Sequence, residues 1–445
     1  AGFSQDDQGN LVAGDGAGAA KDSDTCFNIM IGCNSGAALN SGDHNVLLGH
    51  SAGNAMTSGR CNVAIGVYAM SDGTVTGARN VAIGKHAGRC TTSGSDNIRI
   101  GLEAGQHTTD SSANVNIGRE TGKYSTGGNN VIIGCGSASK SGFSGSGTIA
   151  IGHKAAACAV MTGDNNILLG CDTGCNISSG ANNIAIGKQS AGKCTVTGSE
   201  NIAIGRNAAQ RLTSGNYNIF MGRYAGAGAV NHTGHNNIIM GRSSHFCASA
   251  SNTISIGTKT GGNIQGSTAN VFIGYYAGCG DTGTSATPEG NVFLGAYAGK
   301  CNCGNANVYI GCGAAKPAKN ATRNVVVGKD AGETLNSGSD NTFIGYQAGN
   351  STNTGEYNIF VGAKAGNTNS SGSHNIAIGG DVELPSATAS CQLAIGKGTS
   401  RWITGTSDFN VGIGTTNPSS RLSVAGDACV SGVITATNFA KADGS

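Results

Sequence analysis

The chain has 445 residues, of which 38% are hydrophobic, 5% aromatic and 12% charged, and 76 are glycine. So little bulky apolar content excludes an ordinary globular core and favours a thin, elongated molecule. A net charge of +2 gives no electrostatic footprint for nucleic acid, and no basic run suits a membrane surface. Because no run of 18 apolar residues occurs, the sequence predicts no transmembrane helix.

Residues 1–27 are polar and glycine-rich and are expected to lie outside the repeats that follow. The chain begins at Ala1 without a methionine or a signal-peptide pattern, which is consistent with earlier processing. We therefore interpret 1–27 as an attachment or capping segment.

A five-residue phrase, typified by Asn-Ile-Ala-Ile-Gly at 183–187, then recurs 23 times with closing glycines from Gly32 to Gly414. Most closing glycines are 16 to 18 residues apart. Alternating aliphatic residues are typical of a short strand, and self-similarity at this period is typical of stacked coils. The sequence predicts an all-β fold: a Gly-rich parallel β-solenoid, or β-roll, of about 23 repeats over 28–397. Each coil is expected to contain two or three short strands.

Asparagine opens 20 of the 23 phrases. Coils stacked about 4.8 Å apart would bring these side chains close enough to hydrogen-bond as a ladder. Tolerance of turn backbone angles is the alternative explanation, compatible with the first. The members taken to define the ladder are Asn28, Asn45, Asn62, Asn80, Asn97, Asn183, Asn201, Asn218 and Asn375.

The two flanking aliphatics of each phrase are expected to face into the coil and the middle residue to face outward, yet the middle residue is usually apolar. A strand that is apolar on both faces must be covered on both. We therefore expect a homotrimer packed around the middle residues, with a second layer of the same chain as the alternative. The predicted oligomer seam consists of Leu47, Ile132, Leu168, Phe220, Ile239, Phe272, Phe293, Tyr309, Val326, Phe343 and Phe360.

The 16 cysteines often occupy the same phase of neighbouring repeats. Such cysteines would approach the Cα separation that a disulfide requires, and Cys158 with Cys175 and Cys279 with Cys301 are the best candidate pairs. Cys194 competes for Cys175, and small buried thiols are the alternative. Disulfides would indicate an oxidising, extracellular environment.

The last segment, 398–445, departs from the repeat and is expected to form a short β-shaft. Its run V-G-I-G-T-T-N-P-S-S-R-L-S-V-A-G-D-A-C-V-S-G-V-I-T-A-T-N-F at 411–439 resembles the segment that precedes the C-terminal intramolecular chaperone of tailed-phage tail fibres and spikes. The resemblance implies an intertwined trimeric shaft and a chaperone that is often cleaved. The chain stops at Ser445 without a chaperone, so a cleaved or truncated product is expected.

The repeats, with their N-x-A-I-G-x-x-A-G phrase, are similar to the heads of trimeric autotransporter adhesins. Both resemblances imply a fibre on a virion or another extracellular surface. They imply a homotrimer that contacts other virion or fibre components through 1–27 and a host-surface glycan or protein through its loops or tip. The candidate binding loops are Ala227–His235, Ser243–Ser251 and Cys279–Gly290.

Two other functions remain open at this point. One is a non-viral extracellular filament or adhesin of the same architecture, and the other is a spike that depolymerises polysaccharide. We expect no enzyme activity, because no carboxylate pair suits glycoside hydrolysis. We also expect no cofactor and no metal site, and we interpret His232 and His235 as exposed loop residues.

Overall fold

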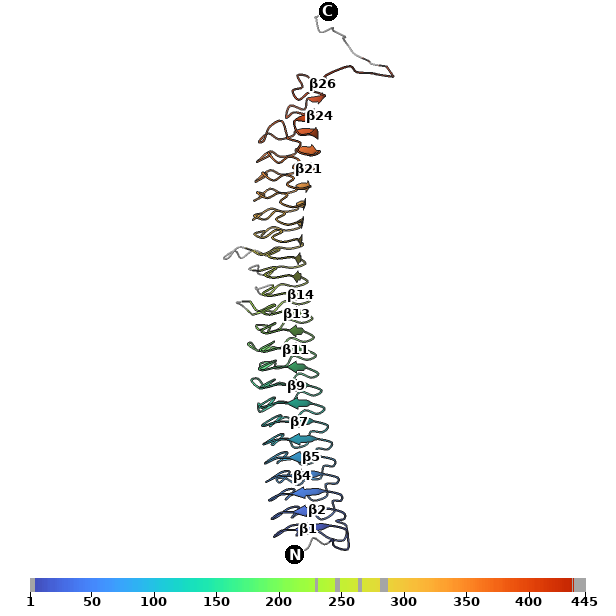
Figure 1. Ribbon diagram of the computed structural model, residues 1–445, viewed down its shortest axis with the longest axis vertical. Coiled ribbons are helices and arrows are strands. Elements are labelled where there is room, and N and C mark those ends of the chain that lie inside the picture. The colour runs from blue at the N-terminus through green and yellow to red at the C-terminus, as the bar shows by residue number, and fades with distance from the viewer. Residues whose placement is uncertain are drawn as a thin grey trace, which may run out of the picture. The chain divides into compact units, whose positions relative to one another are not determined.

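The computed structural model describes residues 5–228, 231–244, 249–262, 266–280, 287–433 and 435. Within these ranges every regular element is a β-strand. The chain divides into two compact units, residues 1–291 and 292–445. Each unit is a stack of similar coils in which one short strand recurs at the same place (Figure 1). The fold is therefore an all-β, parallel β-solenoid with a spacing of about 17 residues, as predicted.

The first unit contains strands β1 to β16, each three residues long. Their bounds are β1 Leu11–Ala13, β2 Ile29–Ile31, β3 Val46–Leu48, β4 Val63–Ile65, β5 Val81–Ile83, β6 Ile98–Ile100, β7 Val115–Ile117, β8 Val131–Ile133, β9 Ile149–Ile151, β10 Ile167–Leu169, β11 Ile184–Ile186, β12 Ile202–Ile204, β13 Ile219–Met221, β14 Ile238–Met240, β15 Ile254–Ile256 and β16 Val271–Ile273.

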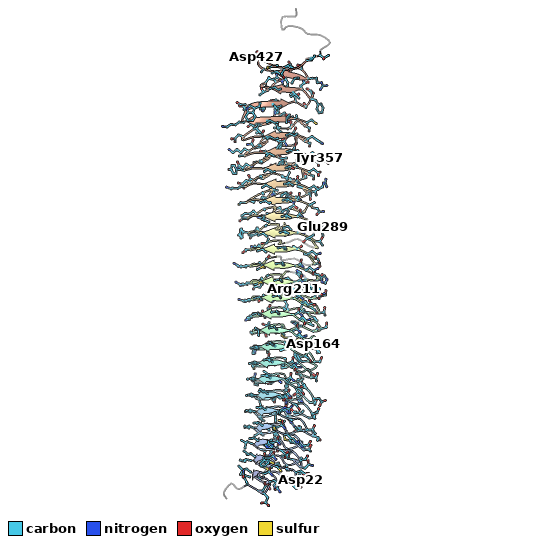
Figure 2. The ribbon with its side chains drawn as sticks, turned by 90° about the vertical axis from the view of Figure 1, so that its right-hand side faces the viewer. Asp22, Asp164, Arg211, Glu289, Tyr357 and Asp427 are labelled. Atoms are coloured by element: carbon cyan, nitrogen blue, oxygen red, sulfur yellow. A yellow bond between two sulfur atoms is a disulfide. The ribbon has the colours of Figure 1, made fainter. Side chains whose placement is uncertain are left out.

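The second unit contains β17 to β26. Their bounds are β17 Val292–Leu294, β18 Val308–Ile310, β19 Val325–Val327, β20 Thr342–Ile344, β21 Ile359–Val361, β22 Ile376–Ile378, β23 Leu393–Lys397, β24 Ser400–Gly405, β25 Val411–Ile413 and β26 Leu422–Val424. Seen from the side, the strands of each unit lie one above the next, and side chains project from them (Figure 2).

Within each unit, neighbouring strands up to β23 pair in parallel with their phrases in register, so that each side chain lies over its equivalent in the next coil. Leu47 of β3, for example, pairs with Ala64 of β4. A coil contains one regular strand, and the described chain adds only isolated bridges such as Met56 to Val75. The expectation of two or three strands per coil is therefore wrong for these residues.

The middle residue of the strand faces into the coil, and the two flanking aliphatics face out. Phe343 is 0% exposed, whereas the adjacent Ile344 is 41% exposed. The predicted orientation is therefore wrong. The reason lies in the asparagine that opens the phrase. Side chains alternate along a strand, so this asparagine and the middle strand residue, two positions later, share one face. Because the amide of Asn341 is buried, Phe343 is buried with it.

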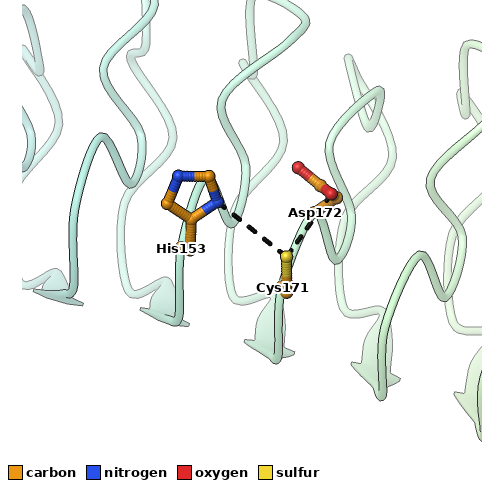
Figure 3. Close-up of side chains that lie close together, drawn as sticks. All are labelled: His153, Cys171 and Asp172. Atoms are coloured by element: carbon orange, nitrogen blue, oxygen red, sulfur yellow. Dashed lines mark hydrogen bonds between the residues drawn. The ribbon is translucent and has the colours of Figure 1, made fainter.

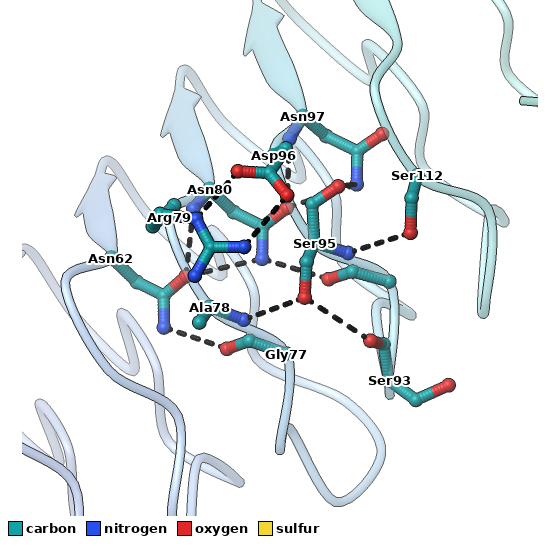
Figure 4. A network of polar contacts seen from close by, with 11 residues as sticks. Asn62, Gly77, Ala78, Arg79, Asn80, Ser93, Ser95, Asp96, Asn97 and Ser112 are labelled. Atoms are coloured by element: carbon teal, nitrogen blue, oxygen red, sulfur yellow. Dashed lines mark hydrogen bonds and ion pairs between the residues drawn. The ribbon is translucent and has the colours of Figure 1, made fainter. Parts of the chain in front are cut away.

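The asparagine side chains form a hydrogen-bonded ladder inside the coils. Asn80 Nδ2 donates to Asn62 Oδ1 over 3.1 Å and to the carbonyl of Gly94 over 2.8 Å, and the Asn80 backbone N–H donates to the same Asn62 Oδ1 (Figure 4). Asn97 repeats these contacts with Asn80. Each amide therefore joins its own coil to both neighbours and satisfies backbone groups that no water reaches.

All the asparagines that defined the predicted ladder are 0–3% exposed and hydrogen-bond an equivalent residue in an adjacent coil. Where another residue replaces the opening asparagine, its backbone N–H still donates to the asparagine side chain of the preceding coil. The N–H groups of Thr148, Thr253 and Gln392 donate to Asn130, Asn237 and Asn375 respectively.

Within the parallel stack, the close approach of neighbouring coils requires glycine at the end of the phrase, as Gly84 illustrates. Gly84 has a φ of +129°, and a Cβ placed on it would lie 2.6 Å from the carbonyl oxygen of Gly101 in the next coil. A side chain at this position would therefore clash with backbone, which cannot move without disrupting the stack.

Stacking begins earlier in the chain than the sequence pattern indicated. β1 follows Asn10 and pairs in parallel with β2, in the register that the later coils use. Asn10 Oδ1 also accepts hydrogen bonds from the backbone N–H and the side-chain amide of Asn28, and these are the first contacts of the asparagine ladder. The phrase Asn-Leu-Val-Ala-Gly at 10–14 is thus a repeat within the segment 1–27 that was expected to lie outside the solenoid.

Parallel stacking in the second unit ends at β23. The chain then reverses, because β24 pairs antiparallel with β23 and β25 pairs antiparallel with β24. β26 pairs in parallel with β25. The last phrase, which closes at Gly414, therefore belongs to this terminal sheet and not to the stack of parallel coils.

Candidate functional site

The outward face of the strands carries a regular series of apolar side chains in each unit. In most of the stacked strands the first and third residues place Ile, Val, Leu or Met side chains on this face; Ala13 of β1 and Thr342 of β20 are exceptions. Many are only partly covered, with exposures of 37–42%. The more exposed examples are Ile29, Ile98, Ile151 and Ile273 in the first unit and Leu294, Ile310, Val325, Ile344, Ile359 and Ile378 in the second. Two parallel columns of aliphatic side chains therefore line each unit.

The residues assigned from the sequence to an oligomer seam lie inside the coils. Leu47, Ile132, Leu168, Phe220, Ile239, Phe272, Phe293, Tyr309, Val326, Phe343 and Phe360 are each 0–1% exposed. They pack between coils, as the parallel stack of the Phe343 and Phe360 rings at 5.1 Å illustrates. A side chain enclosed by its own coil cannot contact a second chain, so this assignment is corrected: the outward positions are the flanking aliphatics.

One of the two candidate disulfides is present. Cys158 and Cys175 are bonded, with their Cα atoms 4.8 Å apart. Cys194, the competing partner, places its Sγ 3.4 Å from Asn231 Oδ1. The pair of Cys279 and Cys301 stays a prediction; Cys279 is buried and Cys301 is half-buried.

Charged surface side chains form pairs between neighbouring coils. Arg79 donates two hydrogen bonds to Asp96, over 2.6 and 2.8 Å (Figure 4), and Arg323 pairs with Asp340 in the same way. The hydrogen bonds from Arg79 hold the pKa of Asp96 below its ordinary value. Carboxylates held ionised in this way do not resemble a general acid, which needs a raised pKa.

A different group of side chains projects from the corner just after β9 and β10. His153 follows Gly152, and Cys171 and Asp172 follow Gly170. The Sγ of Cys171 lies 3.9 Å from His153 Nδ1 and 3.4 Å from Asp172 Oδ2 (Figure 3). Partial burial and the hydrogen bond to Asp172 raise the pKa of the Cys171 thiol. Among the described residues, this is the one set of three His, Cys, Asp or Glu side chains whose potential ligand atoms all lie within 4.8 Å of one another.

The repeat pattern did not predict this cluster. His153 and Cys171 are 18 residues apart, and their proximity follows only from the register of β9 on β10. The signal that could have found them is phase: both directly follow a closing glycine in consecutive repeats.

Two histidines expected to be exposed differ from that expectation to different degrees. His232 is 2% exposed and packs edge-on against Phe220 with ring centroids 5.1 Å apart. Burial lowers the pKa of His232 to about 4. His235 is half-buried and its Nδ1 accepts a hydrogen bond from the backbone of Asn216.

Each predicted binding loop includes residues outside the described ranges. These are 229–230 in Ala227–His235, 245–248 in Ser243–Ser251 and 281–286 in Cys279–Gly290. Within the described ranges, no helical segment has the length and apolar character needed to cross a bilayer. Comparison of the chain with protein-family models gives no match, and comparison with curated proteins gives none either.

Proposed function

We propose that the protein is a structural fibre that assembles as a homotrimer through the outward aliphatic face of its strands and attaches to a host surface. The observation that carries the proposal is the pair of half-exposed aliphatic columns along each unit. Regular apolar surface on this scale favours a protein–protein interface over permanent contact with water.

A second copy of the same chain fits this face better than an unrelated partner. The outward side chains recur once per coil, at the spacing of the stacked strands. Another copy carries the same spacing and can match it coil for coil. A different protein would need an independent repeat of equal pitch.

Three copies suit the two columns. In a ring of three, each chain has two neighbours, so one outward column can pack against each neighbour and close the assembly. An outward Ile or Val that is still about 40% exposed would contribute roughly 0.5–1 kcal/mol on complete burial. Summed over successive coils, this contribution is large enough to hold a stable trimer.

Attachment to a host glycan or protein is assigned to the loops away from the strand face, or to a tip of the fibre. An extracellular position, at a virion surface, accords with the disulfide between Cys158 and Cys175, since such bonds persist in oxidising surroundings. The N-terminal segment would join other fibre or virion components. Replacing the exposed residues Asn231 and Thr233 of the loop Ala227–His235 by alanine should reduce binding to a glycan array without changing the native mass.

The assembly is tested by placing charges on the outward face. The triple variant Ile310→Asp, Ile344→Asp and Ile378→Asp changes every second coil of this part of the stack. We expect it to sediment as a monomer, because three carboxylates per chain would be buried in the interface without partners.

The matched control is Asn320→Asp, Ser337→Asp and Thr354→Asp, which places exposed carboxylates in the loops of the same unit. It should keep the mass of the unaltered protein in analytical ultracentrifugation. An outward-face variant that stays folded and retains the full oligomeric mass would contradict the proposal.

A further inference from the structure

The corner after the strands brings a column of soft ligand atoms together in the first unit. Cys135, His153 and Cys171 directly follow the closing glycines of three consecutive coils. The register of β8, β9 and β10 keeps these three residues in one column, because Ile133 pairs with Ile151 and Ile151 with Leu169. Asp172 adds a carboxylate beside the last of them.

The distances suit a single small cation. A tetrahedral zinc ion with Zn–S near 2.3 Å and Zn–N or Zn–O near 2.0–2.2 Å separates its ligand atoms by roughly 3.6 Å. Cys171 Sγ lies 3.9 Å from His153 Nδ1 and 3.4 Å from Asp172 Oδ2 (Figure 3). Both separations are within a few tenths of an ångström of that value, so side-chain rotation alone can complete the geometry.

The thiol of Cys171 has no competing disulfide partner in its own column. Its column neighbours are His153 and Lys188, and Cys135 is two coils away. Two coil spacings amount to about 9.6 Å, beyond the Cα separation of about 7 Å at which a disulfide becomes impossible without backbone movement. Cys158, in a neighbouring part of the loop, is already bonded to Cys175.

We propose that His153, Cys171 and Asp172 bind a divalent transition metal of borderline softness, with Zn²⁺ as the natural occupant. His153 would supply a ring nitrogen, Cys171 a thiolate and Asp172 a carboxylate oxygen, and water would take the fourth position. Imidazole and thiolate together favour zinc over calcium or magnesium, which prefer all-oxygen sites. On binding, the Cys171 thiol releases its proton to solvent.

The metal would join two successive coils at their outer corner. His153 belongs to the coil of β9, whereas Cys171 and Asp172 belong to the coil of β10. The ion therefore acts as a cross-link beside the disulfide between Cys158 and Cys175, which links loops of the same two coils. Its positive charge would also offset the two negative ligands that face it.

The test uses Co²⁺ as a spectroscopic probe on the full-length protein after removal of metals with a chelator. We expect one Co²⁺ per chain with a thiolate-to-cobalt charge-transfer band that Zn²⁺ abolishes by displacement. Cys171→Ser should remove the band, and His153→Gln and Asp172→Asn should each weaken Co²⁺ affinity at least tenfold. Zn²⁺ should raise the thermal midpoint of the unaltered protein but not that of Cys171→Ser.

The matched control is Cys312→Ser, because Cys312 also directly follows a closing glycine but has Ala296 and Lys329 as column neighbours. It should leave the band, the affinity and the Zn²⁺-dependent stabilisation unchanged. A folded Cys171→Ser protein with an unaltered band, an unaltered protein that shows no band, or equal losses in both serine variants would each overturn the proposal.

Discussion

At the scale of single residues, position within the coil decides the environment more strongly than residue type does. Arg99 is the middle residue of β6, so it lies in the interior at 0% exposure. Its Nη1 donates to Thr91 Oγ1 over 3.1 Å, while Nε and Nη2 have no hydrogen-bond partner among the described residues. Burial lowers the pKa of the Arg99 guanidinium to about 10. A cation is therefore held where the fold disfavours its charge.

Replacing this arginine should stabilise the protein. Arg99→Met removes a buried charge for which the described part of the chain supplies no counter-ion, and it keeps an unbranched apolar side chain. We therefore expect the free energy of unfolding at pH 7 to rise by about 1–3 kcal/mol. Urea unfolding measures the change, with the exposed Arg60→Met as control. A lower stability of Arg99→Met than of the control would show that the guanidinium is satisfied in solution.

His232 should make the first unit sensitive to acid. Its pKa is lowered to about 4, below the ordinary value of 6.5, so between these values the unfolded chain binds a proton that the folded chain does not. Stability is therefore lost as the pH falls through this range, by about 2 kcal/mol between pH 7 and pH 5.

Unfolding measured at both pH values checks this expectation. His232→Phe should lose less stability than the unaltered protein over the same interval, whereas the exposed His44→Asn should behave like the unaltered protein. Equal losses in His232→Phe and in the unaltered protein would assign the acid sensitivity to other groups.

At the scale of the coil, the ladder amide and the strand residue beside it act together. Asn341 Nδ2 donates to Asn324 Oδ1 over 3.0 Å and to the carbonyl of Gly355 over 2.9 Å. Asn341 Oδ1 accepts from the backbone and side chain of Asn358. One substitution at this position therefore leaves groups of three coils without partners.

Asn341→Leu should be strongly destabilising. Several buried donors and acceptors would lose their partners, at about 1–3 kcal/mol each, so we expect a total loss of roughly 3–5 kcal/mol. The measurement is the thermal or urea midpoint, and Asn320→Leu, at an exposed loop position, is the control. A loss below about 1 kcal/mol would mean that neighbouring coils repack around the change.

The sequence sufficed for the solenoid, its period and the asparagine ladder, because these follow from a pattern repeated many times. It did not predict which side chains of the strand point into the coil. Most phrases have aliphatics at the second and fourth places and an apolar residue between them, so hydropathy alone cannot distinguish the two faces of the strand. The buried amide of Asn341 decides the matter, since a ladder sheltered from water must share the interior with Phe343.

Other features depend on the register between coils and are not encoded by local pattern. The cluster of His153, Cys171 and Asp172 arises because β9 and β10 pair without an offset. The residue before each ladder asparagine has a left-handed backbone conformation. The sequence pattern does not predict it, because residues as different as Arg79 and Tyr357 adopt this conformation, with φ of 58° and 56°. The burial of His232 follows from its bridge to Leu212, one coil earlier.

At the scale of the whole molecule, stability is a sum of contributions from nearest-neighbour coils. Each coil buries its ladder amide and its middle strand residue, and the amide forms hydrogen bonds with neighbouring coils. The outward aliphatics are left half-exposed, as Ile344 and Ile359 are at 41% and 42%. Folding of one chain therefore leaves an apolar face that association can cover, and this is the physical basis of the proposed fibre.

The most direct test of this account is the native mass of the unaltered protein, measured by multi-angle light scattering with and without reductant. A homotrimer assembled through the outward face should have three times the chain mass of 43.9 kDa in both conditions, since the described disulfide lies within one chain. An open-ended series of larger masses would indicate a polymerising filament in place of a closed trimer. A monomer would contradict the account, because the outward aliphatic face would then remain in contact with water.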